Sequence, residues 1–175
     1  MPTDLASRVR EAALLEGDFV LSSGKRSSFY VDKYLFSTQP DLLRDLAEAI
    51  SARLPDGVER LAGVELGAVP LVVATSLATG LPYVIVRKSA KQYGSSAGRD
   101  VEGNLESGER VALIEDVVTT GTQAVRAAEN LAKAGAEVVT IVAVLDRREV
   151  SEASLGGFPF QALLRLEDLR VGNRD

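Results

Sequence analysis

Apolar positions at helical spacing open the chain and predict an amphipathic helix that begins behind Thr3 or Asp4 and ends near Gly17. Two short strands are predicted next, at 19–21 and 29–31, on either side of a Ser/Gly turn that carries Lys25 and Arg26. A second helix is predicted to begin near Pro40, with Ser37 or Thr38 as its cap, and to end at about Leu54.

Beyond residue 60 the pattern changes to apolar strands that alternate with helices. Strands are predicted at 61–66, 83–86, 111–114 and 138–145, and they are apolar throughout, as is typical of strands covered on both faces. Helices are predicted at 71–78 and at about 123–134, the second ending at Gly135. This alternation predicts an α/β fold with a parallel sheet built from βαβ units.

The stretch from Ser89 to Ser107 shows neither the helical nor the strand spacing of apolar residues. It contains Gly94, Gly98 and Gly103 together with several serines. A loop of this length inside a compact domain is typical of a lid or binding loop, and the other interpretation is disorder. We find no internal repeat or domain linker, so a single domain is expected.

The composition limits which reactions the chain can catalyse. The chain has no Cys and no His, which excludes Ser-His-Asp and Cys-His mechanisms, disulfides and the usual zinc sites. The groups that remain for catalysis are carboxylates, Lys, Arg, Tyr, hydroxyls, backbone amides and a hard metal such as Mg²⁺. The net charge of −5 argues against a nucleic-acid partner. No segment approaches the roughly 18 apolar residues of a membrane span, and the N-terminus lacks the pattern of a signal peptide, so we expect a cytoplasmic protein with no membrane partner.

The sharpest chemical signal is the stretch 111–123. A buried strand is predicted to deliver Glu115 and Asp116 to its carboxyl end, and a loop of threonines and glycine then opens a helix. Helix N-termini at this edge of an α/β sheet suit a phosphate monoester, and the two carboxylates suit a ligand that also offers hydroxyls, as a ribose does, or a cationic centre. In the alternative interpretation, Thr119 and Thr120 only cap the helix and the carboxylates are a solvated strand end.

The stretch 111–123 resembles the phosphoribosyl-pyrophosphate signature of the type I phosphoribosyltransferases: an apolar strand, two acidic residues, two apolar residues, then a Thr/Ser-Gly-Thr loop. Among the members of that family, the chain is similar to the orotate phosphoribosyltransferases from about Phe19 to Leu169. The segments 21–27, 63–70, 87–91 and 145–147 agree as well. The resemblance implies one domain over residues 1–175, with a parallel sheet flanked by helices, a small N-terminal hood of helix and strands, and a long flexible catalytic loop at about 89–107.

The resemblance also implies a reaction. Members of this branch join N1 of orotate to the anomeric carbon of phosphoribosyl pyrophosphate (PRPP), giving orotidine 5′-monophosphate and pyrophosphate in pyrimidine synthesis. Bond breaking ahead of bond making leaves an oxocarbenium-like sugar and a highly anionic leaving group, so the site needs cations. The cofactor implied is Mg²⁺, bound through the substrate rather than directly by the protein. A homodimer with shared active sites is also implied, because the loop lysine of the family crosses to the other subunit.

Site residues carried over from the family fall into three groups. Lys91, Glu115 and Asp116 are implied to be catalytic, the two acids meeting the ribose hydroxyls. Orotate is implied to contact Thr119, Tyr30, Lys25 and Arg147, whose guanidinium can bind a carboxylate bidentately; the alternatives are a surface position for Arg147 and a core position for Tyr30. PRPP is implied to contact Arg87, Lys88, Lys91, Tyr93, Glu115, Asp116, Val117, Val118, Thr119, Thr120, Gly121, Thr122 and Gln123.

The chain departs from the family pattern at three positions. Tyr93 stands where many members have a histidine, and Ser22 and Gly67 stand where many bacterial members have lysines. Lys25 or Arg26 could replace one of those cations. Two other functions stay open: a phosphoribosyltransferase for a purine or another base, and a nucleic-acid-binding regulator that senses PRPP. The carboxylate contact implied for Arg147 argues against the first, and the acidic charge argues against the second.

Overall fold

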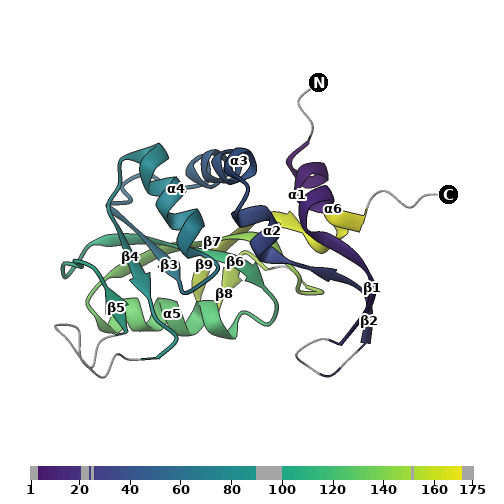
Figure 1. Cartoon of the computed structure of the whole chain (residues 1–175). Coiled ribbons are helices and arrows are strands. Elements are labelled where there is room, and N and C mark those ends of the chain that lie inside the picture. The colour runs from purple at the N-terminus through teal and green to yellow at the C-terminus, as the bar shows by residue number, and fades with distance from the viewer. Residues whose placement is uncertain (1–3, 21–23, 25, 90–99, 151, 171–175) are drawn as a thin grey trace.

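A mostly parallel sheet of seven strands forms the centre of the molecule, in the order β5-β4-β3-β6-β7-β9-β8 (Figure 1). The computed structural model describes residues 4–20, 24, 26–89, 100–150 and 152–170. Short edge strands, β5 (Val101–Glu102) and β8 (Ser154–Leu155), pair antiparallel with their neighbours. The parallel strands are β3 (Arg60–Val64), β4 (Tyr83–Val86), β6 (Arg110–Val118), β7 (Glu137–Asp146) and β9 (Phe158–Arg165). The α/β fold with a parallel sheet is therefore confirmed.

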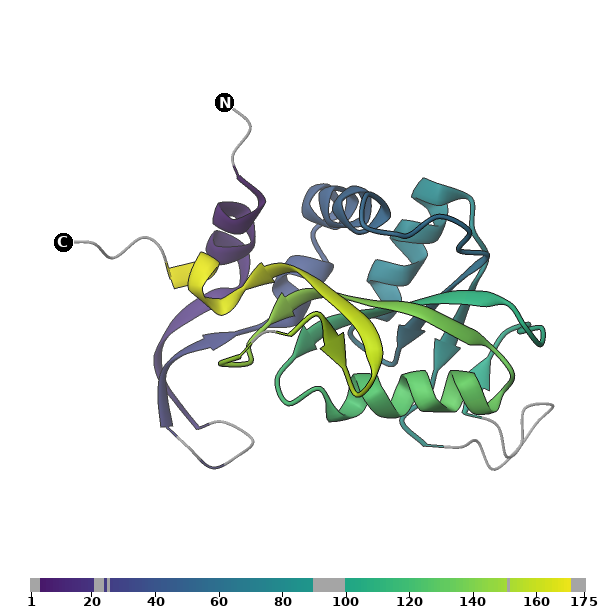
Figure 2. The same ribbon diagram turned by 180° about the vertical axis from the view of Figure 1, so that it is seen from behind.

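Helices cover both faces of this sheet. Helices α3 (Pro40–Ser51) and α4 (Val69–Thr79) lie on one face, and α5 (Thr122–Lys133) lies on the other (Figures 1 and 2). Along β6, Ala112 and Ile114 belong to the core on the α3–α4 side, whereas Val111 and Leu113 belong to the core on the α5 side. This alternation does not continue to the end of β6, where Val117 packs against the core on the α3–α4 side and Val118 belongs to the core on the α5 side. Among the described residues, no helix has the length and apolarity needed to cross a bilayer.

An N-terminal unit stands beside the sheet. Helix α1 (Leu5–Ala13) leads into the hairpin of β1 (Leu14–Val20) and β2 (Arg26–Val31), and the short helix α2 (Lys33–Ser37) follows (Figure 1). The first helix ends earlier than predicted, because Leu14 already pairs with Val31 in the hairpin. Gly17 lies inside β1, near a shift of register, rather than at the helix end.

Other boundaries also differ from the prediction. Neither Ser37 nor Thr38 caps α3; its N-cap is Gln39, which makes no side-chain cap bond. The stretch 89–107 is not wholly a loop, because β5 folds back and pairs with β4, while residues 90–99 lie outside the described residues. The pattern after Leu145 gave no prediction of β8, β9 or helix α6 (Leu166–Arg170).

Candidate active site

Strand β6 extends past its neighbour β3, and the two predicted acids lie on this extension. Pairing with β3 ends at Gly63 and Ile114, whereas pairing with β7 continues to Val118. Glu115 and Asp116 are therefore inside the strand rather than beyond its end, and they are only 5% and 2% exposed. The interpretation of these carboxylates as a solvated strand end is wrong, because continued pairing with β7 keeps them buried.

The side chains of the two acids interact with each other, and Oε1 of Glu115 accepts the Asp116 N–H at 3.0 Å. Glu115 faces the start of α5, where it lines a pocket of about 50 Å³ formed by residues 117–121, 123 and 124. Asp116 also contacts the N-terminal unit, where its Oδ2 lies 2.7 Å from Nζ of Lys33 on α2. Its Oδ1 accepts a hydrogen bond of 2.6 Å from the N–H of Val117. Both oxygens of Asp116 are thus held by the protein.

Burial and mutual charge change the protonation of this pair. Burial, followed by the neighbouring charge of Asp116, raises the pKa of Glu115 to about 8. The Glu115 carboxyl is therefore mostly protonated at neutral pH and is able to donate a hydrogen bond. Burial opposes the charge on Lys33, but the hydrogen bond to Asp116 and its charge outweigh this effect and raise the pKa of the ammonium group. A cation therefore stays against Asp116 across the physiological range.

Gly67 lies in close contact with the Asp116 carboxylate. A Cβ atom at this position would lie 1.6 Å from Oδ2 of Asp116 and 3.1 Å from Cε of Lys33. A side chain at residue 67 is therefore incompatible with this arrangement, and the cation beside Asp116 comes from α2 instead. Lys33 was not among the residues predicted from the sequence. The signal available for it was its rarity, because the chain has only five lysines, together with its place two residues after the aromatic strand.

The loop after β6 presents hydroxyl groups at the start of α5. Thr119 and Thr120 are exposed, and the N-cap residue is Gly121, which has φ of 85° and offers no side-chain cap. A Cβ atom at Gly121 would lie 2.5 Å from Cδ1 of Leu155, so the position admits only glycine. Thr120 Oγ1 lies 3.0 Å from Thr122 Oγ1 and accepts a long bond, 3.4 Å, from the Thr122 N–H. Hydroxyls and first-turn N–H groups thus converge where an anion can bind.

Cationic side chains gather beside this loop. Arg87 and Lys88 follow β4, and together with Gln123 and Arg126 of α5 they line a pocket of about 60 Å³. The Lys88 N–H donates to Oε1 of Glu65 at 2.6 Å, which fixes the backbone at the pocket rim. Arg126 was missed from the sequence, although it lies three residues after Gln123 and so shares its helix face. The predicted contacts Lys91, Tyr93 and Lys25 lie outside the described residues.

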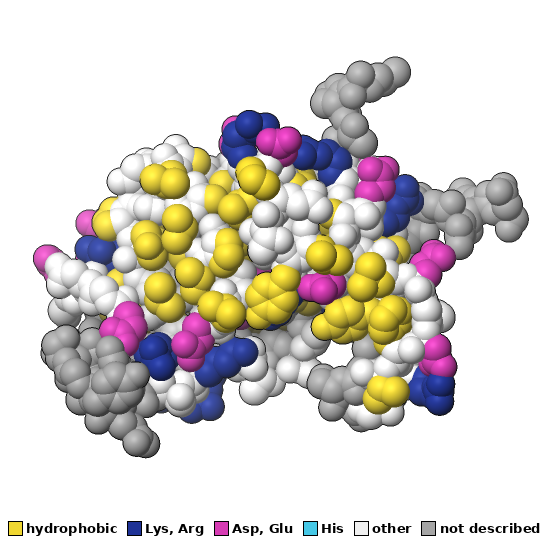
Figure 3. Space-filling view, in the orientation of Figure 1, with side chains coloured by type: hydrophobic (Ala, Val, Ile, Leu, Met, Phe, Trp, Pro, Cys, Tyr) yellow, Lys and Arg dark blue, Asp and Glu magenta, His cyan; other side chains and the backbone are white. Residues whose placement is uncertain are grey.

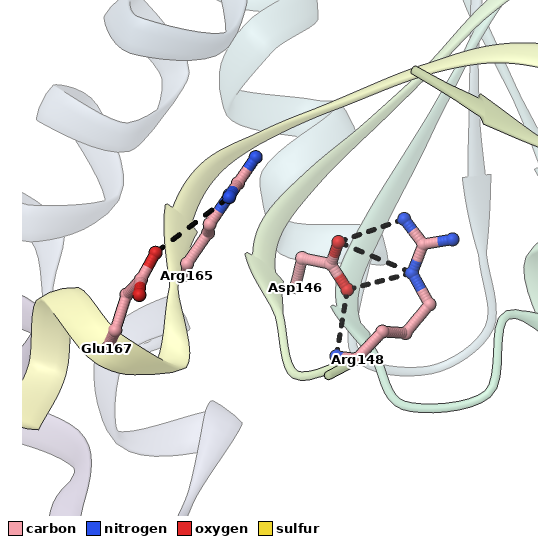
Figure 4. Close-up of polar contacts among 4 residues, drawn as sticks. All are labelled: Asp146, Arg148, Arg165 and Glu167. Atoms are coloured by element: carbon pink, nitrogen blue, oxygen red, sulfur yellow. Dashed lines mark hydrogen bonds and ion pairs between the residues drawn. The ribbon is translucent and has the colours of Figure 1, made fainter. Parts of the chain in front are cut away.

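The turn after β7 carries Arg147 to the end of β6. The Arg147 N–H donates to the carbonyl of Val118 at 2.8 Å, which places Arg147 next to Thr119 in the fold. On the far side of Arg147 the turn is closed by Arg148, which binds both oxygens of Asp146, with Nη2 2.9 Å from Oδ2 and Nε 3.0 Å from Oδ1 (Figure 4). The Arg148 guanidinium also lies over the Phe160 ring, 4.6 Å from its centre.

Tyr30 lies on the hairpin rather than in the core. Its side chain is 39% exposed on β2, and its ring lies 5.7 Å from that of Phe19. The core interpretation of Tyr30 is therefore wrong. Of the predicted orotate contacts, the structure brings Thr119 and Arg147 together, and Tyr30 belongs to the separate N-terminal unit.

Comparison with known proteins agrees with this fold and shows the class of the protein. Residues 38–157, more than half of the chain, match the family model of the phosphoribosyl transferase domain. An orotate phosphoribosyltransferase of Natronomonas pharaonis is 44% identical over 169 residues, covering 95% of each chain. The crystal structure of orotate phosphoribosyltransferase from Aeropyrum pernix superposes with a TM-score of 0.82 at 29% identity, covering 95% of this chain and 96% of that one. The Mycobacterium tuberculosis H37Rv orotate phosphoribosyltransferase in complex with PRPP gives 0.72 at 27% identity, covering 95% and 97%. The chain belongs to the orotate phosphoribosyltransferase family.

Proposed function

We infer that the protein transfers ribose 5-phosphate from PRPP to N1 of orotate, forming orotidine 5′-monophosphate and pyrophosphate. One observation carries this inference: the hydrogen bond from the backbone N–H of Arg147 to the Val118 carbonyl sets Arg147 beside the loop that follows the two buried acids. A carboxylate-binding cation and a ribose-phosphate site therefore share one end of the sheet. A purine offers no carboxylate to Arg147, so this relationship favours orotate.

The described residues have different roles in the proposed reaction. The loop 119–122 and the start of α5 hold the 5′-phosphate, and Glu115 and Asp116 meet the ribose hydroxyls. Arg87, Lys88 and Arg126 face the departing pyrophosphate, whose charge grows as its bond to the sugar breaks. Glu115, protonated at neutral pH, can donate to a hydroxyl oxygen, whereas the Asp116 carboxylate can accept from one.

We propose that Mg²⁺ accompanies PRPP. Within the described ranges, no three acidic side chains are grouped so that they could hold a metal ion, so phosphate and ribose oxygens are its proposed ligands. Arg87, Lys88 and Arg126 fit such a complex, because their charges complement a polyphosphate rather than a bare cation. When bound, the ion would neutralise part of the charge on the leaving group. The proposed compartment is the cytoplasm, because a substrate as highly charged as PRPP does not cross a membrane unaided.

We also propose a homodimer with shared active sites. Large apolar side chains are exposed around α4 and α2, including Leu66 at 64% and Leu77 at 83%, with Tyr34 and Leu35 on α2. Figure 3 shows hydrophobic side chains gathered across this face, from α4 toward the β1–β2 hairpin. A patch of this kind is typical of an interface. Lys91 is proposed to reach the partner's site and to neutralise the leaving group there.

Turnover with a panel of bases tests the reaction. The protein, PRPP and Mg²⁺ should consume orotate absorbance, with no product from hypoxanthine or uracil. Turnover of either of those bases without orotate turnover would overturn the assignment.

Complementation tests the shared site. Lys91→Ala and Asp116→Asn are each expected to be inactive, and mixing them should restore part of the activity, because mixed dimers contain one site with both residues intact. No recovery, despite mixed dimers shown by mass spectrometry, would contradict sharing.

A further inference from the structure

We propose that Lys33 is a positioning residue of the active site: its ammonium group holds the Asp116 carboxylate in the orientation that meets the ribose of PRPP. The proposal rests on the proposed function, because it concerns the same ribose subsite. It adds a residue from the N-terminal unit, which the signature around Glu115 and Asp116 does not contain.

The contact has the geometry of a fixed, partly desolvated pair. Nζ of Lys33 lies 2.7 Å from Oδ2 of Asp116, and the side chains are 33% and 3% exposed. Because the Val117 N–H holds the other oxygen at 2.6 Å, the carboxylate has a partner on each side. The close approach of Gly67 removes the remaining space behind it. The rotation of Asp116 is thus restricted by three separate elements: α2, β6 and the turn after β3.

Lys33 reaches Asp116 because of where α2 begins. Asp32 is the N-cap of this short helix and accepts the N–H of Tyr34 at 3.0 Å, so the chain turns directly after β2. Lys33 is the first residue of the helix, and its Nζ lies 5.6 Å from the centre of the Tyr34 ring. Among the ion pairs of the described residues, Asp116 takes part in this one alone. Removing the ammonium group therefore leaves a buried carboxylate without its counter-charge.

A purely structural role would produce a different signature. If the pair only attached the N-terminal unit to the sheet, its loss would lower thermal stability and leave substrate affinities alone. If Lys33 orients Asp116, its loss raises the KM for PRPP and leaves the KM for orotate unchanged, because Asp116 faces the ribose in the proposed function. The two roles are therefore separated by comparing the KM values of the two substrates.

Kinetics of position 33 variants test the proposal. Lys33→Met is expected to raise the KM for PRPP by about tenfold or more, the scale of a lost hydrogen bond to a charged group. The KM for orotate should stay nearly unchanged, and Lys33→Arg should recover most of the affinity. Lys133→Met, at an exposed lysine in the last turn of α5, is the matched control and should behave as wild type. A lower Tm with an unchanged KM for PRPP would overturn the proposal.

A double-mutant cycle tests whether Lys33 acts through Asp116. If it does, Lys33→Met combined with Asp116→Asn should bind PRPP no more weakly than Asp116→Asn alone. Additive losses would contradict the proposal. Calorimetric titration with PRPP in the absence of orotate provides the readout, so this result remains interpretable if orotate turnover fails. If Lys33→Met does not fold, Lys33→Gln, which keeps a donor without the charge, takes its place in both experiments.

Discussion

Arg148 forms a bidentate ion pair with Asp146 (Figure 4), whose side chain is 1% exposed, and Arg147 lies between these two residues in the chain. The backbone N–H of Arg148 donates to the same carboxylate at 3.0 Å. Because Arg147 is anchored to Val118 through its own N–H, its position depends on a turn that is held from both ends. The proposed orotate side of the site is thus built on a buried ion pair that does not itself belong to the signature stretch.

Arg148→Met tests this support. The substitution removes the bidentate guanidinium partner of the buried Asp146 carboxylate, which costs about 3–5 kcal/mol of unfolding free energy. Urea denaturation measures this loss. The KM for orotate should also rise, because the turn around Arg147 relaxes. The control is Arg165→Met, whose pair with Glu167 is exposed on both sides (Figure 4), and there the loss should stay below about 1 kcal/mol.

Arg147→Ala tests the carboxylate contact. We expect the KM for orotate to rise far more than the KM for PRPP, because only orotate offers a carboxylate to this guanidinium. Steady-state kinetics with each substrate varied in turn measures the difference. Arg147→Lys should recover little, since an ammonium group does not reproduce the bidentate geometry. Equal effects on both substrates would contradict the assignment.

Glu115→Gln should remove a pH dependence of stability. An unfolded glutamate has its ordinary pKa of 4.5, whereas burial raises the pKa of Glu115 to about 8 in the folded protein. Between these values the folded state binds the extra proton, so the stabilising contribution is complete below the lower pKa and is lost as pH rises through the upper one. Thermal melts across this range should show a falling Tm for wild type and a smaller fall for Glu115→Gln. Glu48→Gln, at an exposed position of α3, should follow wild type; if Glu115→Gln does the same, Glu115 is not the group that titrates.

Gly67→Ala should damage PRPP binding more than folding. The added Cβ would overlap Oδ2 of Asp116, so the carboxylate must move out of its position. PRPP titration should show a large loss of affinity. Gly80→Ala is the comparison, because Gly80 caps α4 with φ of 75° in open space, and alanine there strains the backbone without touching the site. Gly80→Ala should lower Tm and leave PRPP binding intact; a similar loss of binding in both variants would refute the specific role of Gly67.

Arg126→Met should weaken the binding of PRPP and of pyrophosphate. Arg126 lines the same pocket as Arg87 and Lys88, so its loss removes one of the three cations that we propose face the leaving group. Inhibition by pyrophosphate measures the effect, which should shrink as salt is added. Arg44→Met, at a side chain 65% exposed on α3, serves as the control. A pyrophosphate affinity equal to that of Arg44→Met would exclude Arg126 from the subsite.

The sequence predicted those parts of the site that depend on neighbours along the chain. The run of apolar residues into Glu115 and Asp116, followed by threonines and a glycine, identified both the strand and the loop that opens α5. The contact of Lys33 with Asp116 joins positions far apart in sequence, and it depends on how α2 packs against the sheet. The spacing of apolar and polar residues along the chain does not predict such a contact. Two-residue strands such as β5 are too short to show alternation, so the sequence pattern over 89–107 predicts a loop throughout.

The contact between the Glu115 and Asp116 side chains has a consequence for any ligand that touches both. Asp116 is held by Lys33 of α2, and Glu115 lines the pocket at the start of α5, so such a ligand meets groups that two different helices position. Its affinity then reports how α2 and α5 are placed relative to each other. Distant substitutions that shift one of these helices should alter ribose recognition without touching a single site residue.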